Sequence, residues 1–543
     1  MKLSRIAVLG GGPGGLYAAR LLKRSHPDAE VTVYEQGSPD TTFGFGVGLA
    51  SRTQRNLRQA DPDSLDAIVA VSHPHEMSMR VGDHVARLSH GELLAIARTT
   101  LLEVLQDHAT AAGVRLEFGA RRSVADLDAD LIVAADGVNS ATRTDLADDL
   151  GPAISTGEGL YLWCGTDFAL PSAIFTPVTT EHGTFVAHAY PYASDRSTFL
   201  IETDETTWRR AGFDVSTEAT GVADSDETAL AYLQEAFADA LDGHRLIGNR
   251  TRWLRFRTVT CNRWHTGNVV LLGDAAHTAH YSIGSGTKLA MEDAIELDRA
   301  VRHATTLDEA LSAYESARRP NVEYLQSIAT RSEQWWESFP RRADMPVDQL
   351  MIAYMTRAGK VGIDRFAASA PEVARRGLAA YADVDPASVP DAATAQWIVA
   401  QPLVRGPWSF PSRGAPVQLR SEPGTLRLDV DVDSAWGPGA GRLVAEAAHA
   451  TVVWLTGRGD RDAVLTRLDV GERLRRETGA LVVVEAPGSS YDDLVAGLVS
   501  LRADLVFVTD AAVADEAVGD GAAVDELREV ERNTEAERTI LRL

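Results

Sequence analysis

Four short apolar runs have the length and composition of buried strands. The runs are Ser4–Leu9, Glu30–Tyr34, Leu131–Ala135 and Val269–Leu272. Strands covered on both faces give such continuous runs. Helical stretches are predicted after the first run, to about Arg24, and over Glu92–Ala109. Because strands that alternate with helices pair in parallel, this part of the chain predicts an α/β domain.

The hydrophobic pattern changes between about residues 155 and 262. The segments LYLWCGTDF, GTFVAHAYPYA, STFLIET and TRWLRFRTV are rich in strand-forming residues with partial alternation. This favours a mostly antiparallel sheet inserted between two halves of the α/β domain. Within Thr184–Tyr190, alternation places His188 and Tyr190 on one side of the strand. The two side chains either point together into a pocket or lie on a solvated face, and the pattern leaves both open.

Beyond a segment rich in proline, alanine and serine, the C-terminal part alternates again. Thr451–Leu455, Ala480–Glu485 and Ala503–Val508 are strand candidates separated by helical stretches, which predicts parallel pairing. The acidic tail Ala511–Leu543 predicts a final helix. These changes divide the chain into residues 1–155, 156–262, 263–385 and 386–543, and the first and third of these ranges form the two parts of one α/β domain.

Charge and cysteine content exclude several classes of protein. A net charge of −24 over 543 residues offers no basic surface to neutralise phosphates, so nucleic-acid binding is not expected. Cys164 and Cys261 form no CxxC pair, so neither a disulfide framework nor a metal site is expected, and a reducing cytoplasm fits. No stretch approaches the roughly 20 apolar residues of a membrane span, so no membrane partner is expected. The opening MKLSRIAVLGGG predicts a strand rather than a signal peptide.

A glycine motif follows the first predicted strand. Gly10, Gly12 and Gly15 match GxGxxG between a strand and a helix, and Glu35 ends the next strand, 20 positions after Gly15. The first glycine permits a tight turn, the second lets the backbone approach a pyrophosphate, and the third brings helix and strand together. Glu35 is expected to bind a ribose hydroxyl pair. The combination predicts a dinucleotide site.

A second glycine-punctuated loop follows the run Val269–Leu272. Gly273 and Asp274 stand at the carboxyl end of that strand, where open α/β sheets bind ligands. Gly284 and Gly286 then lead into a helix predicted to begin at Thr287. The free N–H groups and positive dipole end of this helix suit an electron-rich acceptor, such as the pyrimidine edge of an isoalloxazine.

A third motif, DGxxSxxR, begins at Asp136 and Gly137 directly after Leu131–Ala135. Together with GxGxxG and GDAAH it resembles the three-part pattern of the FAD-dependent aromatic hydroxylases. The resemblance implies a Rossmann-type FAD-binding domain of the p-hydroxybenzoate hydroxylase fold, with the inserted antiparallel β-sheet as substrate-binding domain. It also implies that NAD(P)H reduces FAD as co-substrate without a separate nicotinamide domain. Asp136 and Gly137 would then contact the cofactor.

The resemblance narrows in the segments WCGT, TEHGTFVAHAY, STFLIET, NRWHTGNVVLLGDAAHTAHYSIGSGTKLAMEDAI and ARRPNVEYLQ. These are similar to the branch that acts on coenzyme A thioesters, and His280-Tyr281-Ser282 replaces the prolines usual elsewhere in the superfamily. The implied reaction is hydroxylation of salicylyl-CoA at C5 to gentisyl-CoA, in which reduced FAD and O2 give a C4a-hydroperoxide. Alternatives are 2-aminobenzoyl-CoA, a free aromatic metabolite, or a scaffold that has lost catalysis. The oligomeric state stays open between monomer and homodimer.

Further residues are candidates for the site. His188, Tyr190, His280 and Tyr281 are candidates for the base that draws a proton from the ring hydroxyl. Arg98, near the start of a predicted helix, either holds a cofactor phosphate or ring or is simply exposed. The glycine-rich run Phe43–Gly48 predicts a loop without regular structure. Gly284 to Thr287 would stabilise negative charge at the pyrimidine edge of the flavin.

Two expectations concern the thioester and the C-terminal region. Arg341 and Arg342 are candidates to grip CoA phosphates, and Trp335 and Trp336 to stack on adenine or pack in the core. The run GERLRRETGALVVVEA and its continuation resemble the last units of an old-yellow-enzyme barrel. Residues 390–543 are 154 positions, against roughly 250 for a complete barrel. The resemblance therefore implies a shortened remnant without its own flavin.

Overall fold

Parallel strands form where the sequence predicts apolar runs. In the computed structural model, which describes residues 1–39, 44–392 and 394–509, β1 (Arg5–Leu9) lies between β2 (Glu30–Glu35) and β7 (Leu131–Ala134) and is parallel to both. The sheet has six strands in the order β16-β17-β7-β1-β2-β6, the others being β6 (Arg115–Phe118), β16 (His265–Thr266) and β17 (Val269–Leu271). The predicted α/β domain with a parallel sheet is confirmed.

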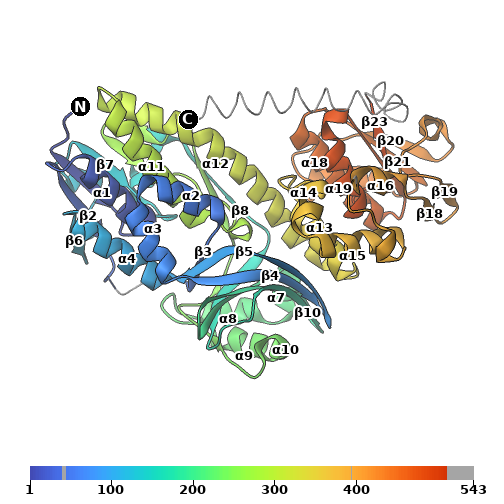
Figure 1. Ribbon diagram of the computed structural model, residues 1–543, viewed down its shortest axis with the longest axis horizontal. Helices are drawn as coiled ribbons and strands as arrows, with labels where there is room; N and C mark the ends of the chain where they lie inside the picture. Colours follow the sequence, from blue (N-terminus) through green and yellow to red (C-terminus); the bar gives the residue numbers. More distant parts are fainter. Residues whose placement is uncertain (40–43, 393, 510–543) are drawn as a thin grey trace. The chain divides into compact units, whose positions relative to one another are not determined.

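Helices cover this sheet and bury its apolar side chains. Helix α1 (Pro13–Ser25) packs against α11 (Gly286–His303) and α4 (Arg98–Ala111), as Figure 1 shows. Val8, Val133 and Val270 are fully buried between the layers. The remaining helices before the inserted sheet are α2 (Ser51–Ala60), α3 (Pro62–Ala70), α5 (Ala141–Asp145) and α6 (Ala147–Leu150).

Two local predictions were wrong near this domain. The predicted helix over Glu92–Ala109 begins only at Arg98, because the apolar residues before it belong to β5 (His84–Ala97). The glycine-rich run expected to lack regular structure contains β3 (Gly46–Leu49), which pairs with β5. Phe43, at the start of that run, lies outside the described residues. Pairing with neighbouring strands overrides the local preference in both places.

The second sheet is larger than the predicted insertion. It has nine strands, eight of them in the order β13-β9-β12-β11-β10-β4-β5-β3 and the ninth, β14, paired with β9. Three strands come from residues 46–97, and β4 pairs in parallel with β10. The antiparallel strands of residues 160–203 were predicted. The strands not yet bounded are β4 (His73–Val81), β9 (Leu160–Thr166), β10 (Ala173–Thr180), β11 (Gly183–Ala193), β12 (Arg196–Thr203), β13 (Leu246–Ile247) and β14 (Trp253–Leu254).

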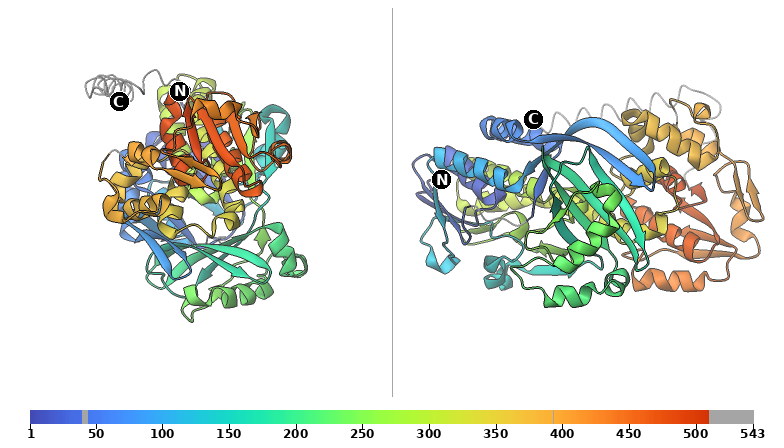
Figure 2. Two further views of the ribbon diagram at one scale, coloured as in Figure 1. Left: turned by 90° about the vertical axis from the view of Figure 1, so that its right-hand side faces the viewer. Right: turned by 90° about the horizontal axis from the view of Figure 1, so that it is seen from below.

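One face of this sheet is covered by short helices. Phe185, Ala187 and Phe199 belong to a core cluster with residues of α8 and α9, and Figure 2 shows these helices, in green, against the strands. His188 projects from the opposite face, as period-two alternation predicts. The helices are α7 (Glu205–Arg210), α8 (Phe213–Ala219), α9 (Glu227–Ala236) and α10 (Ala238–Leu241).

The long helix α12 (Leu307–Glu337) follows α11 and begins with a capping box. Thr306 accepts a hydrogen bond from the Glu309 N–H, and the Glu309 carboxylate accepts from the Thr306 N–H. Two reciprocal bonds satisfy donors that a helix start otherwise leaves free. A separate antiparallel pair, β8 (Pro152–Thr156) with β15 (Arg257–Cys261), lies where the chain enters and leaves the larger sheet.

The chain divides into two compact units, residues 1–347 and 348–543. The second unit has a parallel sheet in sequence order, β20-β21-β22-β23, with helices between the strands. Residues 451–508 form the predicted β-α-β-α-β succession, and β20 was not predicted. The strands are β18 (Leu403–Arg405), β19 (Trp408–Phe410), β20 (Thr425–Asp429), β21 (Val452–Thr456), β22 (Leu481–Ala486) and β23 (Leu505–Val508). The helix predicted after residue 510 lies outside the described residues.

The boundary between the units falls earlier than the predicted position at 385/386. Helices after residue 347 pack within the second unit: α16 contacts α19, and the Gln349 amide donates a hydrogen bond to the Val499 carbonyl oxygen (2.8 Å). The helices are α13 (Val347–Thr356), α14 (Ile363–Ser369), α15 (Pro371–Ala382), α16 (Thr394–Ala400), α17 (Pro438–Glu446), α18 (Arg461–Glu477) and α19 (Tyr491–Val499).

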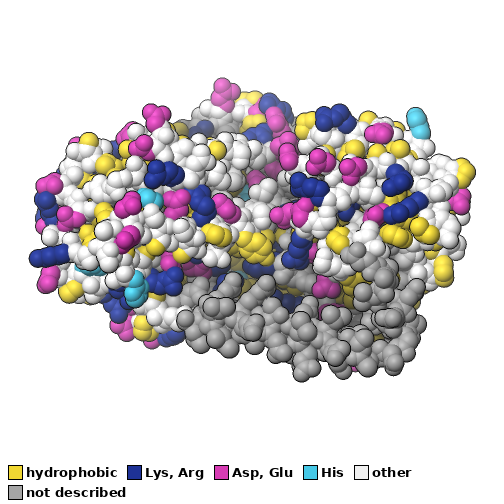
Figure 3. Space-filling model, turned by 90° about the horizontal axis from the view of Figure 1, so that it is seen from above, with side chains coloured by type: hydrophobic (Ala, Val, Ile, Leu, Met, Phe, Trp, Pro, Cys, Tyr) yellow, Lys and Arg dark blue, Asp and Glu magenta, His cyan; other side chains and the backbone are white. Residues whose placement is uncertain are grey.

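Acidic and basic side chains share the described surface. On the face drawn in Figure 3, Lys and Arg side chains of the described residues are interspersed with Asp and Glu. Within residues 1–39, 44–392 and 394–509, no helix is both long and apolar enough to cross a bilayer.

Candidate functional site

The first glycine loop has one open position and two crowded ones. A Cβ on Gly10, whose φ is +102°, would lie 2.2 Å from the Ala135 carbonyl oxygen, and a Cβ on Gly15 would lie 2.1 Å from the Gly10 oxygen. A Cβ on Gly12 would meet nothing within 4 Å. The first and third glycines are therefore required by the turn and its packing, whereas Gly12 presents bare backbone to open space.

Glu35 is held beside this loop at the carboxyl end of β2. Its carboxylate accepts hydrogen bonds from the N–H groups of Gly11 (2.7 Å) and Gly37 (2.6 Å). The side chain is only partly buried. It lies where the spacing predicts an acid for a ribose, at the edge of the open space in front of Gly12.

The DGxxSxxR motif joins two loops of the site. Asp136 accepts hydrogen bonds from the N–H and hydroxyl of Thr142 through one oxygen, while its other, buried oxygen has no partner among the described residues. Arg143 donates to the carbonyl oxygens of Val138 (2.6 Å) and Ala275 (2.8 Å). The arginine, which the motif alone left without a role, thus ties the loop after β7 to the loop after β17. A Cβ on Gly137 would face open space.

Asp274 and Arg98 face each other across this region. Asp274 is accessible to solvent yet surrounded by protein, and this burial raises the pKa of its carboxyl group. Burial lowers the pKa of Arg98, and the charge of Asp274 opposes that shift. The Nε of Arg98 is buried with no hydrogen-bond partner among the described residues. An accessible acid and an unsatisfied guanidinium are suited to a polar ligand between them.

The amino terminus of α11 is open on the same side of the sheet. A Cβ added to Gly284, whose φ is +59°, or to Gly286 would meet nothing within 4 Å. Ser285, the N-cap residue, makes no side-chain cap, so the first N–H groups of the helix have no capping side chain within the described chain. Thr287 follows in the first turn. An 18-residue helix with an uncapped start is suited to an electron-rich acceptor.

These loops fit FAD. They follow β1, β2, β7 and β17, which are neighbours in the parallel sheet, so they share one edge. The bare backbone at Gly12, the unsatisfied Asp136 oxygen and the unsatisfied Arg98 Nε are features that a bound dinucleotide would satisfy. The structure brings together all twelve predicted cofactor residues: Gly10, Gly12, Gly15, Glu35, Arg98, Asp136, Gly137, Gly273, Asp274, Gly284, Gly286 and Thr287.

The four catalytic candidates divide into two groups. His188 is buried, with its Nε2 atom 3.3 Å from Glu202 Oε2 and its ring centroid 6.4 Å from that of Tyr281. Tyr190 instead donates its hydroxyl hydrogen to the Gly46 carbonyl oxygen (2.8 Å) and lies near Arg98. The interpretation as a solvated face was wrong, and so was the shared pocket, because the two side chains leave β11 toward different neighbours.

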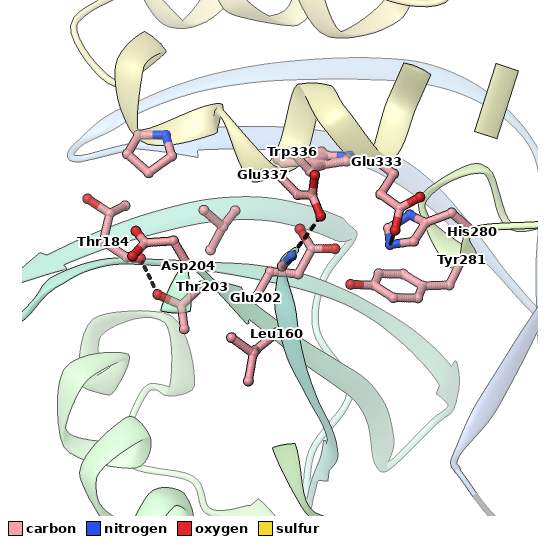
Figure 4. Close-up of a pocket in the computed structure, with 13 residues that line it drawn as sticks. Leu160, Thr184, Glu202, Thr203, Asp204, His280, Tyr281, Glu333, Trp336 and Glu337 are labelled. Carbon is pink, nitrogen blue, oxygen red and sulfur yellow. Dashed lines mark hydrogen bonds and ion pairs between the residues drawn. The ribbon is translucent and has the colours of Figure 1, made fainter. Parts of the chain in front are cut away.

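His280 and Tyr281 line a partly open cavity between β12 and α12. His280 Nδ1 lies 2.9 Å from the Ser282 hydroxyl, and its Nε2 lies 4.0 Å from Glu333 Oε1. Figure 4 shows carboxyl groups of β12 and α12 turned toward the same space. The lining residues are Gly159, Leu160, Thr184, Val186, Glu202, Thr203, Asp204, His280, Tyr281, Glu333, Trp336, Glu337 and Pro340.

Sequence reasoning missed the three carboxyl groups Glu202, Glu333 and Glu337. The available signals were an acid inside the apolar run STFLIET and two acids four residues apart beside a tryptophan pair. Burial would raise the pKa of Glu202, but the charges of His188 and His280 outweigh it and lower that pKa. Burial, followed by the charges of Glu337 and Glu202, raises the pKa of Glu333 to about 8.

The residues expected to hold CoA are mostly internal. Arg342 is buried and donates to the Trp335 carbonyl oxygen (2.8 Å) and the Ser338 hydroxyl (2.9 Å), so its predicted phosphate contact was wrong. Trp335 and Trp336 are also buried, and Trp336 packs on His188 with ring centroids 4.2 Å apart. Trp335 therefore packs in the core, whereas Trp336 is buried but also lines the cavity. Arg341 is exposed.

Two family models and several known proteins are similar to this chain in sequence. Residues 120–328 match the family described as FAD binding domain, and residues 8–40 match NAD(P)-binding Rossmann-like domain. A salicyloyl-CoA 5-hydroxylase of Streptomyces sp is 38% identical over 92% of this chain and 99% of its own length. The Streptosporangium sibiricum 5-monooxygenase of 3-hydroxy-4-methyl-anthranilyl on an aryl-carrier protein is 40% identical over 66% of this chain and 95% of its own length.

A solved structure supports the fold. The crystal structure of a mutant 2-methyl-3-hydroxypyridine-5-carboxylic acid oxygenase superposes with a TM-score of 0.51 at 20% identity, covering 69% of this chain and 97% of that chain. At this identity the likeness concerns the fold alone.

Proposed function

The chain belongs to the FAD-dependent aromatic hydroxylases, in the branch that includes salicyloyl-CoA 5-hydroxylase, and we propose that it hydroxylates salicyloyl-CoA (also written salicylyl-CoA) at C5 to give gentisyl-CoA. It is a flavoprotein monooxygenase that uses FAD and NAD(P)H. The observation that carries the proposed substrate is the 38% identity over 99% of the length of a relative with that name. A cytoplasmic location belongs to the same proposal, supported by two unpaired cysteines.

In this proposal the glycine loops hold the cofactor. Gly12 contacts the pyrophosphate, and Glu35 contacts the ribose. Asp274 and Arg98 contact the part of FAD that lies between the ribose and the isoalloxazine ring. The amino terminus of α11, from Gly286, stabilises negative charge at the pyrimidine edge of the ring. Bound FAD, once reduced, would activate O2. One oxygen atom of that O2 is then transferred to the ring.

Residues that line the cavity interact with the hydroxyl group of the substrate ring. The Glu202 carboxylate lines the cavity, with His188 Nε2 3.3 Å behind it. It accepts the hydrogen bond of the ring hydroxyl and so enriches the para carbon in electron density. Tyr281 and His280 line the cavity and orient the ring. Tyr190, bonded to Gly46 and near Arg98, positions the cofactor side of the site rather than the ring.

An amino-substituted thioester is the second candidate. The anthranilyl-acting relative is slightly more identical, at 40%, although it matches a shorter part of this chain. An amino group para to the attacked carbon directs hydroxylation as a hydroxyl does. A carboxylate beside His188 accepts a hydrogen bond from either substituent.

The test compares three substrates on the FAD-loaded protein. NADH oxidation is followed with salicyloyl-CoA, 2-aminobenzoyl-CoA and free salicylate in turn, with products identified by mass spectrometry. We expect a gain of one oxygen on salicyloyl-CoA. If only 2-aminobenzoyl-CoA is hydroxylated, it is the substrate in place of salicyloyl-CoA. If only salicylate is hydroxylated, the substrate is the free acid and not a CoA thioester.

A further inference from the structure

The cavity beside Tyr281 has an acidic lining. Four lining residues are acidic, Glu202, Asp204, Glu333 and Glu337, and none of the described residues that line it is Lys or Arg. His280 also lines it, and His188 lies behind Glu202. Sites that bind an aryl carboxylate ordinarily provide a guanidinium or ammonium partner. The lining therefore does not suit an anionic ligand.

One of these acids is left with an unsatisfied oxygen. Glu202 is 8% exposed, and its Oε1 atom is buried with no hydrogen-bond partner among the described residues. Figure 4 shows this side chain directed between Glu337 and Tyr281. A buried acceptor without a donor is costly, so it points to a ligand that donates a hydrogen bond there.

Glu333 and Glu337 crowd one wall of the cavity. Glu337 Oε1 accepts a hydrogen bond from the Gly159 N–H (2.6 Å). A Cβ on Gly157 would lie 2.2 Å from Glu333 Oε1 and 3.3 Å from Glu337 Oε1. Both carboxyl groups therefore lie against Gly157. The Glu333 carboxyl group faces Glu337 and Glu202 as well as His280 and Tyr281.

Crowding and burial make Glu333 a hydrogen-bond donor at neutral pH. Its pKa, raised to about 8 by burial and then by Glu337 and Glu202, keeps its proton in place below that pH. Glu202 has a lowered pKa and stays ionised. At pH 7 Glu202 thus offers a carboxylate that accepts and Glu333 a carboxylic acid that donates.

We propose that Glu202 and Glu333 make this cavity selective for aromatic substrates whose acyl group is uncharged, such as a thioester, and against the corresponding free carboxylates. The ring hydroxyl donates to Glu202, and the acyl carbonyl oxygen accepts from Glu333. A free carboxylate brings a further negative charge among carboxyl groups, and the described lining residues include no Lys or Arg to offset it. This selectivity rests on the proposed function, since it names the substrate class of the same site.

The test separates the acyl charge from the CoA moiety. Methyl salicylate and salicylate share the ring and hydroxyl and differ in the charge of the acyl group. Binding of each to the FAD-loaded protein is measured from the change in flavin absorbance. We expect methyl salicylate to bind at least about tenfold more tightly at pH 7, the effect of one hydrogen bond gained or one repulsion avoided. Equal binding, or tighter salicylate, would overturn the proposal.

The variant Glu333→Gln tests the donor. Its amide donates a hydrogen bond but does not titrate. From pH 7 to 9 the affinity of the wild-type protein for methyl salicylate should fall about tenfold as Glu333 ionises, whereas that of Glu333→Gln should stay constant. Glu323→Gln, an exposed acid on the same helix, should behave as wild type. A Glu333→Gln variant that keeps the alkaline loss would refute the role of Glu333.

The outcomes distinguish this inference from the proposed function. If salicyloyl-CoA gains one oxygen and salicylate nevertheless binds as tightly as its ester, the function stands and the selectivity is wrong. If the ester is preferred but salicyloyl-CoA is not hydroxylated, the function is wrong and the cavity selects another uncharged aromatic. The comparison of ester and acid uses the wild-type protein, so it does not depend on the folding of a variant.

Discussion

Gly12 is the residue at which the backbone itself forms the cofactor surface. A Cβ at this position would touch no protein atom within 4 Å, so Gly12→Ala should leave the fold intact. The methyl group would instead occupy the space of the pyrophosphate. We expect loss of FAD binding, measured as a colourless protein with wild-type circular dichroism. Gly441→Ala in α17, where the nearest atom would lie at 3.6 Å, should keep its flavin. A yellow, flavin-replete Gly12→Ala protein would refute the site.

Glu202 acts on the reaction by accepting the hydrogen bond of the ring hydroxyl, with His188 behind it. Glu202→Gln preserves the shape of the side chain but removes the charge that lies 3.3 Å from His188 Nε2. We expect kcat/KM for salicyloyl-CoA to fall about 100-fold, within the range of general-base effects, while NADH oxidation becomes uncoupled from product formation. The ratio of hydroxylated product to NADH consumed gives the measurement. Glu181→Gln, at an exposed turn, serves as control, and an unchanged ratio in Glu202→Gln would contradict the role.

The sequence predicted the residues of the cofactor loops but not the acids of the cavity. Gly10, Gly12 and Gly15 are recognisable because their spacing is local and follows from the turn itself. Glu202 becomes a site residue only through the register of two strands, since it pairs with Val186 across β11 and β12. Glu333 comes from a helix more than a hundred residues further along the chain. Contacts of that range leave no spacing signal in a single sequence.

At the scale of elements, Asp293 joins helix α11 to the flavin loop and to α12. Its carboxylate accepts hydrogen bonds from the Gly273 N–H (3.0 Å) and Arg318 Nε (2.8 Å) and lies 2.8 Å from His277 Nε2. Burial opposes its ionisation, but His277 and Arg318 outweigh it and lower its pKa from 3.8 to about 2. One carboxylate therefore holds three elements in place behind Asp274.

Asp293→Asn should destabilise the first unit. Breaking a buried pair leaves the Arg318 charge uncompensated, and we expect a loss of about 3 kcal/mol at pH 7. Because the pKa is lowered in the folded state, the contribution of Asp293 is complete above about pH 4 and is lost as the pH falls through about 2. Urea unfolding should show the wild-type and variant stabilities converging over that range. Asp28→Asn, an exposed change, should stay within about 0.5 kcal/mol of wild type, and a constant difference at all pH values would exclude the linkage.

Elements were predictable where local and long-range preferences agree. The strands β1, β2, β7 and β17 have apolar runs that only a covered parallel sheet accommodates. The segment before Arg98 was assigned to a helix because ELLAIA has residues common in helices, but hydrogen bonding to β3 and β4 draws it into β5. The conformation of such segments depends on their partner strands, which cannot be identified from a single sequence.

At the scale of the whole chain, the second unit is built from consecutive parallel β/α pairs. The order β20-β21-β22-β23 follows the sequence, as in part of a (β/α)8 barrel. One face of the sheet packs on the hairpin β18–β19, through Leu403, Trp408 and Phe410 with Trp454. Side chains of the unit itself fill the face that would line a barrel interior. The described strands have the order expected of a shortened barrel, and the barrel remnant stays a prediction.

The position of the unit boundary decides how the second unit can be removed. A chain ending at residue 389 would keep helices α13–α15 but remove α16 and α19, on which α14 packs, and should aggregate because the apolar face of α14 is exposed. A chain ending at Val347 should fold, bind FAD and hydroxylate salicyloyl-CoA, since residues 1–347 form a compact unit that contains the cofactor loops and the cavity. Size-exclusion chromatography, flavin content and product formation would be compared for the two truncations. A soluble, FAD-bound chain of 347 residues that no longer hydroxylates the thioester would show instead that the second unit takes part in the reaction.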